Sequence, residues 1–561
     1  MEVLSDKMLE AVKRLQEEIL KDNKVDKAET ELLLNFARPL AEHDKEMAGF
    51  VKALEEVRED GVITPEESLR IGAYLKWLAR ERSATKPDTG FFGKLFKLNT
   101  NRTSIKTEVI AGLTTFMTMA YILAVNPNIL SMAGIPRGGV FMATAVAAVV
   151  GTLLMAFMSN YPFVLAPGMG LNAFLTFGVV LGMGYSWQFA LLAVFVEGIV
   201  FLALSLTPVR EGIFNAIPFS LKKAVAAGIG LFICLIAMKT AGIIVDNQAT
   251  LVSLVKFNDV PFQTHGICAV LALFGTILTG FMLVKGLKGA ILFGILATWG
   301  LGMIAQAAGI YIPDAAAGYF SLYPDFSIKG LAQNFSEFGN TVGGLFKPDG
   351  WTLSKDGAVV RSGWELVKTL DFFVVMFAFF FVDLFDTLGT LIGVSMKGGF
   401  LDKDGKLPRI SGALCADSIA TSVGAVFGTS TTTTFVESAS GVMAGGKTGL
   451  TGVTSAALFA LSIIFAPVFL AIPGFATAPA LIIVGYMMLS SCADVDWSDA
   501  GEAVPAFLAV AAMPFTYSIS DGIMFGVIAY TIINALSGNF KRIHWIMYIL
   551  TVLFIAKYAV M

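Results

Sequence analysis

The apolar residues divide the chain into two parts with different patterns. In residues 1–90, apolar side chains recur every three or four positions among charged ones, which predicts about four amphipathic helices of a small soluble domain. Beyond residue 107, apolar residues form runs of about 20, the length that an α-helix needs to cross a bilayer. We therefore predict an all-α polytopic membrane protein with a helical soluble domain ahead of it. The soluble helices are expected near residues 3–21, 27–40, 45–59 and 64–82.

The apolar runs form two sets of seven, separated by a polar stretch. A final run at 543–560 either crosses the bilayer or lies along its surface, and the pattern does not decide between the two. The first set lies near residues 108–130, 138–159, 168–183, 187–206, 221–245, 264–285 and 288–308. The second set lies near residues 366–396, 409–428, 430–445, 448–470, 473–491, 503–517 and 520–537.

Two of these segments are interrupted at corresponding places, each being third in its set. Residues 161–177 carry Pro162, Pro167, Gly168 and Gly170, and residues 428–441 begin with a run of threonines that favours extended backbone. Paired interrupted segments indicate an inverted-repeat transporter whose site lies near the bilayer midplane. Irregular backbone at that depth survives where it lines a cavity. We therefore predict fourteen segments in a 7+7 inverted repeat, with two half-helices that each follow a short extended segment.

These boundaries give six expected regions. They are a soluble domain (1–90), a linker (91–106), the first repeat (107–308), an extracytoplasmic loop (309–365), the second repeat (366–540) and a C-terminal apolar helix (541–561).

Composition supports this division. Of the 561 residues, 55% are hydrophobic and 15% are charged, and mean hydropathy is +0.72. The first 97 residues hold 37 of the 83 charged residues. The net charge of -3 argues against a nucleic-acid partner. Four cysteines and three histidines without metal-site spacing predict no metal and no cofactor, and no nucleophile–base pair suggests an enzyme.

Basic residues predict the orientation, because positively charged loops face the cytoplasm. Clusters precede the first segment and follow the fourth, sixth, eighth and fourteenth. We therefore expect the soluble domain and all even-numbered segment ends on the cytoplasmic side of the cell (inner) membrane. The clusters are Lys94, Lys97, Arg102 and Lys106; Arg210, Lys222 and Lys223; Lys285 and Lys288; Lys397, Lys403, Lys406 and Arg409; and Lys541 and Arg542.

The soluble domain contains a short internal repeat. Residues 22–29 (DNKVDKAE) and 60–67 (DGVITPEE) resemble the second half of an EF-hand calcium loop. The first half departs from that pattern, because Arg58 stands where calcium needs an oxygen ligand. A pair of helix–turn–helix units, as in tellurite-resistance-B-like domains, is therefore favoured over a calcium sensor, and both interpretations stay open.

An ionisable residue at the bilayer centre costs about 2.5–3.5 kcal/mol on insertion scales, and seven residues of the predicted spans are candidates for such a position. Asp371 is near a span end. Asp417, Glu197 and Lys239 are expected to bond to polar neighbours within the bundle. The remaining three, Asp383, Asp386 and Glu437, are candidates for function.

Asp383 and Asp386 share one helix face, and like charges so placed hold protons more tightly, which suits a proton carrier. Glu437 directly follows the threonine run, and Asn172 occupies the matching place in the first set. Carboxylates facing a cavity repel anions and accept hydrogen bonds from N–H groups. A neutral planar heterocycle therefore fits, with Phe174 and Phe435 placed to cover its faces.

Four motifs carry a resemblance to a known family, over residues 105–540. They are 112–127 (GLTTFMTMAYILAVNP), 166–174 (APGMGLNAF), 385–390 (FDTLGT) and 431–437 (TTTTFVE). Together they resemble the AzgA-like adenine/guanine/hypoxanthine permeases of the nucleobase–ascorbate transporter (nucleobase/cation symporter-2) family. That resemblance implies a core domain from segments 1–4 and 8–11, a gate domain from segments 5–7 and 12–14, and elevator-like proton symport. It also implies a homodimer.

Carried onto this chain, the resemblance implies that Asp386 and Glu437 hold a purine nucleobase. Asn172 would contribute from the first half-helix, and the backbone near Phe435 and Val436 would lie alongside the ring. One position departs from the family: uracil-type members carry a histidine where this chain has Thr390. Proton coupling would then rest on the acids Asp383, Asp386 and Glu437. Alternatives are a transporter of the same fold for xanthine, urate or uracil, and an anion exchanger or channel.

Overall fold

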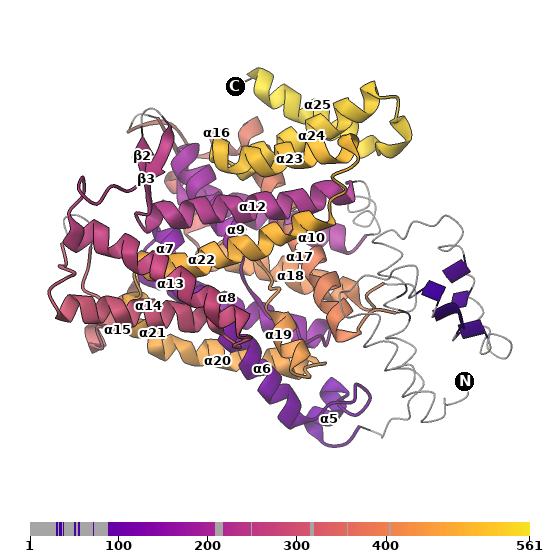
Figure 1. Ribbon diagram of the computed structural model, residues 1–561, viewed down its shortest axis with the longest axis horizontal. Helices are drawn as coiled ribbons and strands as arrows, with labels where there is room; N and C mark the ends of the chain where they lie inside the picture. The colour runs from indigo at the N-terminus through magenta and orange to yellow at the C-terminus, as the bar shows by residue number, and fades with distance from the viewer. Residues whose placement is uncertain are drawn as a thin grey trace.

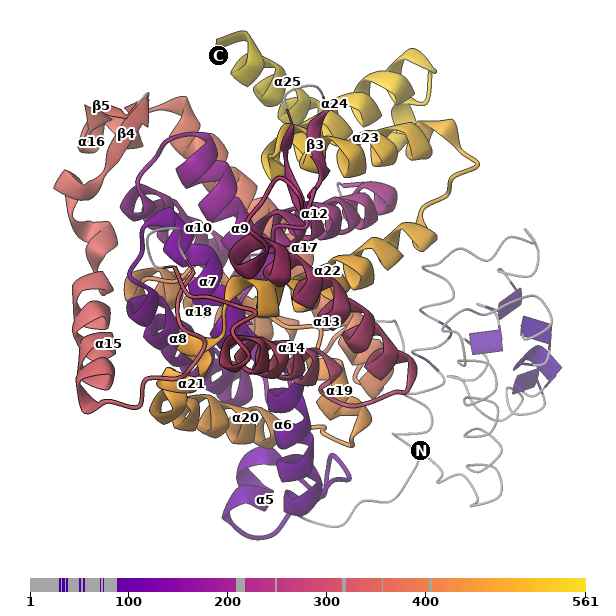
Figure 2. The ribbon, with the colours of Figure 1, turned by 60° about the vertical axis from the view of Figure 1, so that its left-hand side comes forward.

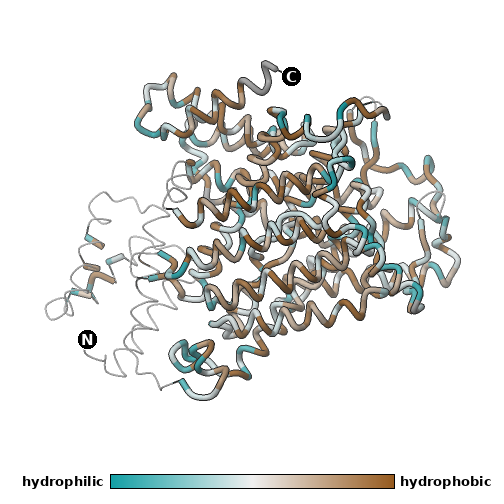
Figure 3. The backbone as a smooth tube through the Cα atoms, turned by 180° about the vertical axis from the view of Figure 1, so that it is seen from behind, coloured by the Kyte–Doolittle hydropathy of each residue, from teal (hydrophilic) through white to brown (hydrophobic). Residues whose placement is uncertain are grey.

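The computed structural model describes residues 88–560, except 208–216, 248–249, 315–318, 356 and 403–405, together with scattered residues between 30 and 74. Within these residues, eleven helices are long and apolar enough to cross a membrane. The tube in Figure 3 shows hydrophobic helices with hydrophilic residues gathered toward their ends. The structure thus confirms the predicted all-α polytopic membrane fold.

Each predicted segment of the first set corresponds to a helical element. The third, interrupted segment is a short strand followed by a short α-helix and a π-helix. The elements are α6 (Ile105–Met119) with α7 (Ile122–Leu130), α8 (Arg137–Met158), β1 (Leu165–Pro167) with α9 (Met169–Ala173) and η2 (Phe174–Gly182), α10 (Trp187–Ser205), α12 (Phe219–Thr240), α13 (Ile267–Val284) and α14 (Ala290–Ala307).

The second set repeats this order, again with a strand before a short helix at its third place. The elements are α17 (Leu370–Gly398), α18 (Ile410–Phe427), β6 (Thr432–Thr434) with α19 (Ser438–Met443), α20 (Gly449–Ser462) with α21 (Ala466–Ala471), α22 (Gly474–Leu489), α23 (Ala500–Thr516) and α24 (Ile519–Leu536). The predicted 7+7 organisation, with two half-helices after extended segments, is therefore confirmed.

The two interrupted segments meet at the centre of the fold. β1 pairs antiparallel with β6, with Ala166 opposite Thr433. The ladder continues at both ends, because the Gly168 N–H donates to the Thr431 carbonyl oxygen (3.0 Å) and the Phe435 N–H to that of Val164 (3.0 Å). Each strand thereby satisfies backbone groups of the other that no water could reach inside a membrane.

The helices pack in two groups. α6, α8, α10, α17, α18 and α20 pack on one another, and α12, α13, α14, α22, α23 and α24 form the second group. In Figure 1, α23 and α24 lie on one side, α6 and α20 on the opposite side, and α12 and α22 between them. α12 and α22 cross closely at two glycines: a Cβ on Gly230 would lie 2.6 Å from the carbonyl oxygen of Gly485.

Hydroxyl side chains fix where several spans begin. The Ser104 side chain accepts from the Thr107 N–H at the start of α6, and Ser186 does so from Phe189 at the start of α10. Thr369 caps α17 by accepting from the Phe372 N–H. Such caps satisfy N–H groups that have no partner within the helix.

The polar stretch after the first set contains structure that the sequence did not predict. It forms α15 (Ile328–Thr341) and a hairpin of β4 (Thr352–Lys355) and β5 (Ala358–Ser362), followed by α16 (Trp364–Val367). Figure 2 shows these elements along one side of the molecule. α15 packs on α8, and Glu337 accepts a hydrogen bond from the Gly138 N–H (2.8 Å). A second hairpin, β2 (Ile244–Asn247) with β3 (Leu251–Leu254), follows α12.

The two ends of the chain are described unequally. The C-terminal helix α25 (Trp545–Val560) packs on α24, and Phe554 lies 6.3 Å from the ring centre of Phe377 on α17. At the N-terminal end, the described residues between 30 and 74 are helical, and the Phe50 and Tyr74 rings stack at 4.1 Å. The repeat at 22–29 and 60–67 lies outside the described residues.

Candidate functional site

Asp386 lies on a face of α17 that is open to solvent. Asp386, Gly389 and Gly393 are exposed, at the three-to-four spacing of one helix face, whereas Asp383 and Thr387 beside them are buried. A Cβ on Gly389 or Gly393 would meet no atom within 4 Å. Because an acid is not expected to face lipid, we interpret this face as lining a water-accessible space.

Glu437 lies across the β1–β6 crossing from the start of the first half-helix. Its carboxylate accepts a hydrogen bond from the buried Tyr121 hydroxyl (2.6 Å) and lies close enough to Asp386 for electrostatic interaction. Glu437 is half-buried, and its neighbour Val436 is 57% exposed. The acids of the eighth and tenth segments are thus brought together at one solvent-open place.

Strand β1 leads from this site directly into the first half-helix. A Cβ on Gly168, which directly follows β1, would lie 3.9 Å from an Asp386 carboxylate oxygen. The same Cβ would lie 2.9 Å from the Thr433 methyl carbon, so glycine at this position permits the close approach of β1 to β6. Four residues on, Asn172 is fully buried: its Nδ2 donates to the Pro167 carbonyl oxygen (3.5 Å), and its Oδ1 accepts from the Ser430 hydroxyl.

The two phenylalanines proposed to cover a ring are both buried. Phe174 packs on Phe379 with ring centres 4.8 Å apart, and it is 1% exposed. Phe435 is 5% exposed at the end of β6. In this conformation both rings are packed inside the protein, whereas Val436, next to Phe435, is exposed. A stacking role for either ring would require it to rotate or the helices to move.

Behind the open face lies a buried polar cluster that the sequence did not single out. Asp417 accepts from the Thr434 N–H (3.0 Å), the Thr434 hydroxyl (3.0 Å) and the Thr387 hydroxyl (2.8 Å), so it does bond within the bundle as expected. Asp383 accepts from the Thr387 (3.3 Å) and Thr421 (3.4 Å) hydroxyls. These two acids therefore hold β6 in place from the side opposite the open face.

The other ionisable residues of the spans have ordinary surroundings, with one exception. Lys239 pairs with Asp246 (2.9 Å) at the end of α12, and Asp371 accepts from the Tyr185 hydroxyl (3.0 Å) at the start of α17. The exception is Glu197 on α10. No group in the described part of the chain donates to either of its carboxylate oxygens, so it does not pair as expected.

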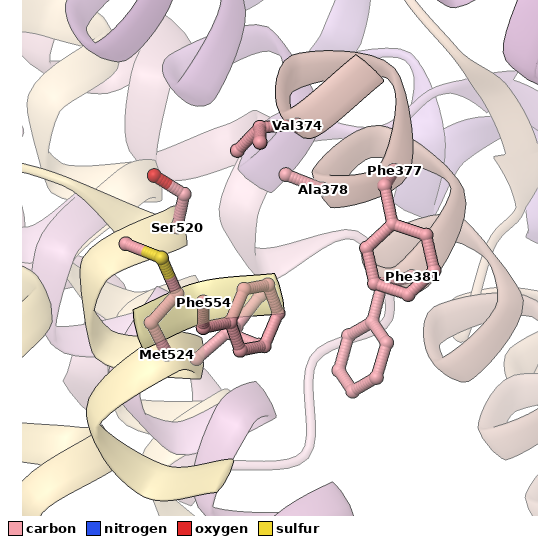
Figure 4. A pocket seen from close by; sticks show the side chains of 8 residues that line it. Val374, Phe377, Ala378, Phe381, Ser520, Met524 and Phe554 are labelled. Carbon is pink, nitrogen blue, oxygen red and sulfur yellow. The ribbon is translucent and has the colours of Figure 1, made fainter. Parts of the chain in front are cut away.

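The arrangement at Asp386 and Glu437 suits a neutral ligand with N–H donors. The two acids offer several acceptors, and they disfavour an anion. Among the described residues, no three His, Cys, Asp or Glu side chains are placed to hold a metal ion. A separate pocket between α17, α24 and α25 is apolar except for Ser520, which makes it unsuited to such a ligand (Figure 4).

The chain matches known transporters along most of its length. Residues 106–525 match the model of a permease family. The chain is 42% identical to guanine/hypoxanthine permease PbuO of Bacillus subtilis over 464 residues, 82% of this chain and 98% of that protein. It is 37% identical to adenine permease AdeQ of Escherichia coli over 471 residues, 84% of this chain and 96% of that protein.

The fold has a counterpart among solved structures. The murine Solute Carrier 26 family member A9 anion transporter, solved in the inward-facing state, has a TM-score of 0.52 to this structure. The match covers 82% of this chain and 74% of that one at 12% identity, so it concerns the fold alone. It shares the 7+7 inverted repeat. The sequence matches place the chain in the permease family, among the nucleobase–ascorbate transporters that its motifs resemble.

Proposed function

We propose that the protein is a secondary transporter that imports purine nucleobases (adenine, guanine or hypoxanthine) together with protons. The observation that carries this proposal is the pairing of Asp386 and Glu437 at one solvent-open place beside the β1–β6 crossing. The printed names of relatives at 37–42% identity, adenine and guanine/hypoxanthine permeases, support the same substrate class.

The proposed binding mode follows from the inventory of donors and acceptors. A purine presents ring and exocyclic N–H groups along one edge, and carboxylates accept such hydrogen bonds strongly. Asp386 and Glu437 would accept them, and Tyr121 holds Glu437 in position through its hydroxyl. Asn172 would act from behind β1, and Phe174, Phe435 and Val436 would form the apolar surroundings of the ring.

In this proposal the same acids also couple the transport of the substrate to the transport of protons. Asp383, Asp386 and Glu437 are acids near the crossing, and a carboxylate that binds a substrate N–H in one state can take a proton in another. We further propose that the soluble domain faces the cytoplasm of the cell (inner) membrane, following the basic clusters such as Lys94 to Lys106.

We also propose a homodimer in the bilayer. α13 presents a row of exposed apolar side chains (Phe274, Ile277, Phe281 and Val284) that either lipid or a second copy would cover. Native mass spectrometry of the protein released from detergent measures the state directly, and a monomer at all concentrations would contradict a dimer.

Uptake by proteoliposomes tests the proposed substrate and the site together. Labelled adenine, guanine and hypoxanthine are each supplied with and without an inward proton gradient, and xanthine, urate, uracil and bicarbonate serve as competitors. We expect purine accumulation in the wild type and its loss in Asp386→Asn and Glu437→Gln. Asp371→Asn is the matched control, because that acid lies at a span end against Tyr185. Transport of xanthine, uracil or an anion without purine uptake would contradict the proposed substrate.

A further inference from the structure

Glu197 has an unusual environment for an acid inside a membrane domain. Its side chain is fully buried in α10, and no group among the described residues donates to either carboxylate oxygen. The side chain in contact with it is the carboxyl group of Asp383 on α17. Asp417 on α18 adds a third acid to the same surroundings.

The elements around Glu197 supply acids and no cation. α10 packs on α18 and α17, and the charged groups facing Glu197 from those helices are Asp417 and Asp383. Asp386, one turn along α17, interacts in turn with Asp383. In the part of the chain that the structure describes, no lysine or arginine forms an ion pair with any of these acids.

Two carboxyl groups in contact form a hydrogen bond when one of them carries a proton, because an ionised carboxylate has acceptors alone. Two unprotonated carboxylates would instead repel each other without water to solvate them, which is strongly unfavourable in a protein interior. Asp417 already receives three hydrogen bonds, whereas no amide or hydroxyl group of the described residues donates to Glu197. The geometry therefore places the shared proton between Glu197 and Asp383.

We propose that Glu197 and Asp383 form the binding site of the proton that is transported with the substrate, an inference that rests on the proposed function. The proton is taken from water on the outer side, bound between the two carboxyl oxygens, and released to water on the inner side. Glu197 is thus a coupling residue that does not touch the nucleobase, and Asp386 and Glu437 keep the binding role.

The threonines around Asp383 connect this proton site to the substrate site. Thr387 contacts Asp383 and Asp417, and its hydroxyl lies 2.5 Å from that of Thr433 in β6. Thr421 contacts Asp383 and donates to the carbonyl oxygen of Thr432 (3.2 Å). Loss of the proton draws these hydroxyls toward a charged Asp383, away from β6. Val436 and Glu437 follow the end of this strand. A shift of β6 on loss of the proton therefore moves the residues that are proposed to bind the substrate.

Infrared difference spectroscopy tests the proton site without using transport. A protonated carboxyl group inside a protein gives a carbonyl stretching band that shifts in heavy water. We expect wild-type protein in lipid to show this band, and Glu197→Gln to lose its intensity, while the matched variant Asp371→Asn keeps it. An unchanged band in both Glu197→Gln and Asp383→Asn would overturn the proposal whatever the protein transports.

Proteoliposome assays test the coupling role. An inward gradient of about one pH unit can drive about tenfold accumulation for each coupled proton. We expect Glu197→Gln to lose this accumulation while it still binds purine and exchanges labelled for unlabelled purine at a rate within a few-fold of wild type. Accumulation at the wild-type level in Glu197→Gln, or dependence on sodium in place of protons, would overturn the proposal. If wild-type protein neither binds nor exchanges purines, the proposed function fails instead, and the infrared result still decides the proton site.

Discussion

Glu108 and Glu197 are both fully buried acids in the same group of helices, and their surroundings are opposite. Glu108, in the first turn of α6, accepts hydrogen bonds from the Lys447 N–H and from the N–H and hydroxyl groups of Thr448 and Thr451, at 2.6–3.2 Å. Glu197 accepts none from the described residues and contacts another acid.

This difference separates a structural acid from a functional one. Five donors compensate Glu108 for lost hydration, and these hydrogen bonds tie α6 to the start of α20. Glu197 has no such compensation, so its burial reduces stability unless a proton is present. Residues that are retained at a cost to stability are common at functional sites.

The largest effect on folding is expected for Glu108→Ala. The substitution removes the acceptor of five hydrogen bonds and leaves the buried Thr448 N–H and hydroxyl without one, and each unsatisfied group costs about 1–3 kcal/mol. We expect poor insertion or a large fall in the apparent melting temperature in detergent, measured by intrinsic fluorescence. Asp371→Ala, which removes one bond to Tyr185 at a span end, is the matched control. Equal stability of the two variants would contradict the comparison.

The opposite result is expected for Glu197→Met and Glu197→Gln. An apolar side chain of similar volume removes the cost of burying a carboxyl group that receives no hydrogen bond from the described residues. A glutamine amide can donate to Asp383 in place of the shared proton. We expect the melting temperature to be unchanged or raised, in the same fluorescence assay. A fall as large as that of Glu108→Ala would mean that Glu197 is structural.

An intermediate effect is expected for Asp417→Ala, which removes the acceptor that joins α18 to β6. The Thr434 N–H and hydroxyl lose this acceptor, which we expect to cost about 2–4 kcal/mol and to lower purine affinity because the proposed binding residues directly follow β6. Thr434→Val removes one hydroxyl and serves as the milder comparison. Wild-type affinity in Asp417→Ala, measured by isothermal titration, would argue against a role of this acid in the site.

The smallest effect concerns an exposed ion pair outside the spans. Hydrogen bonds to Arg542 and to the Gly501 N–H lower the pKa of Asp499 below 3.8. Because the folded state then binds this proton less tightly than the unfolded chain, the stabilisation is present above pH 3.8 and disappears as the pH falls through the folded pKa. We expect Asp499→Asn to lower the melting temperature slightly at pH 7 and not at pH 3. A larger effect at pH 3 would contradict this sign.

The central crossing could be predicted from the sequence because its signals are local. Pro162, Pro167 and Gly168, close together in the chain, disfavour a continuous helix, and a threonine run favours extended backbone. The register of Ala166 opposite Thr433 could not be predicted, because it depends on how two segments more than 250 residues apart meet. Asp386 and Glu437 were found for a related reason: charge in an apolar run is visible without a structure.

The proton site could not be predicted in the same way. α10 is apolar on nearly all sides, so its periodicity does not show which face Glu197 occupies. Asp383 and Asp386 are three residues apart, yet one is buried and the other exposed. The rotation of α17 about its axis determines which acid faces the cavity and which faces α10. This rotation is set by the packing of the helices. The hairpin β4–β5 and α15 were missed because polar loops carry no membrane-span signal.

The account rests most directly on one measurement, the accumulation of labelled purine in proteoliposomes under an imposed proton gradient. We predict accumulation of at least one of adenine, guanine and hypoxanthine that collapses when a protonophore is added and is absent in Glu437→Gln. No accumulation of any of the three, or a Glu437→Gln variant as active as wild type, would contradict the account.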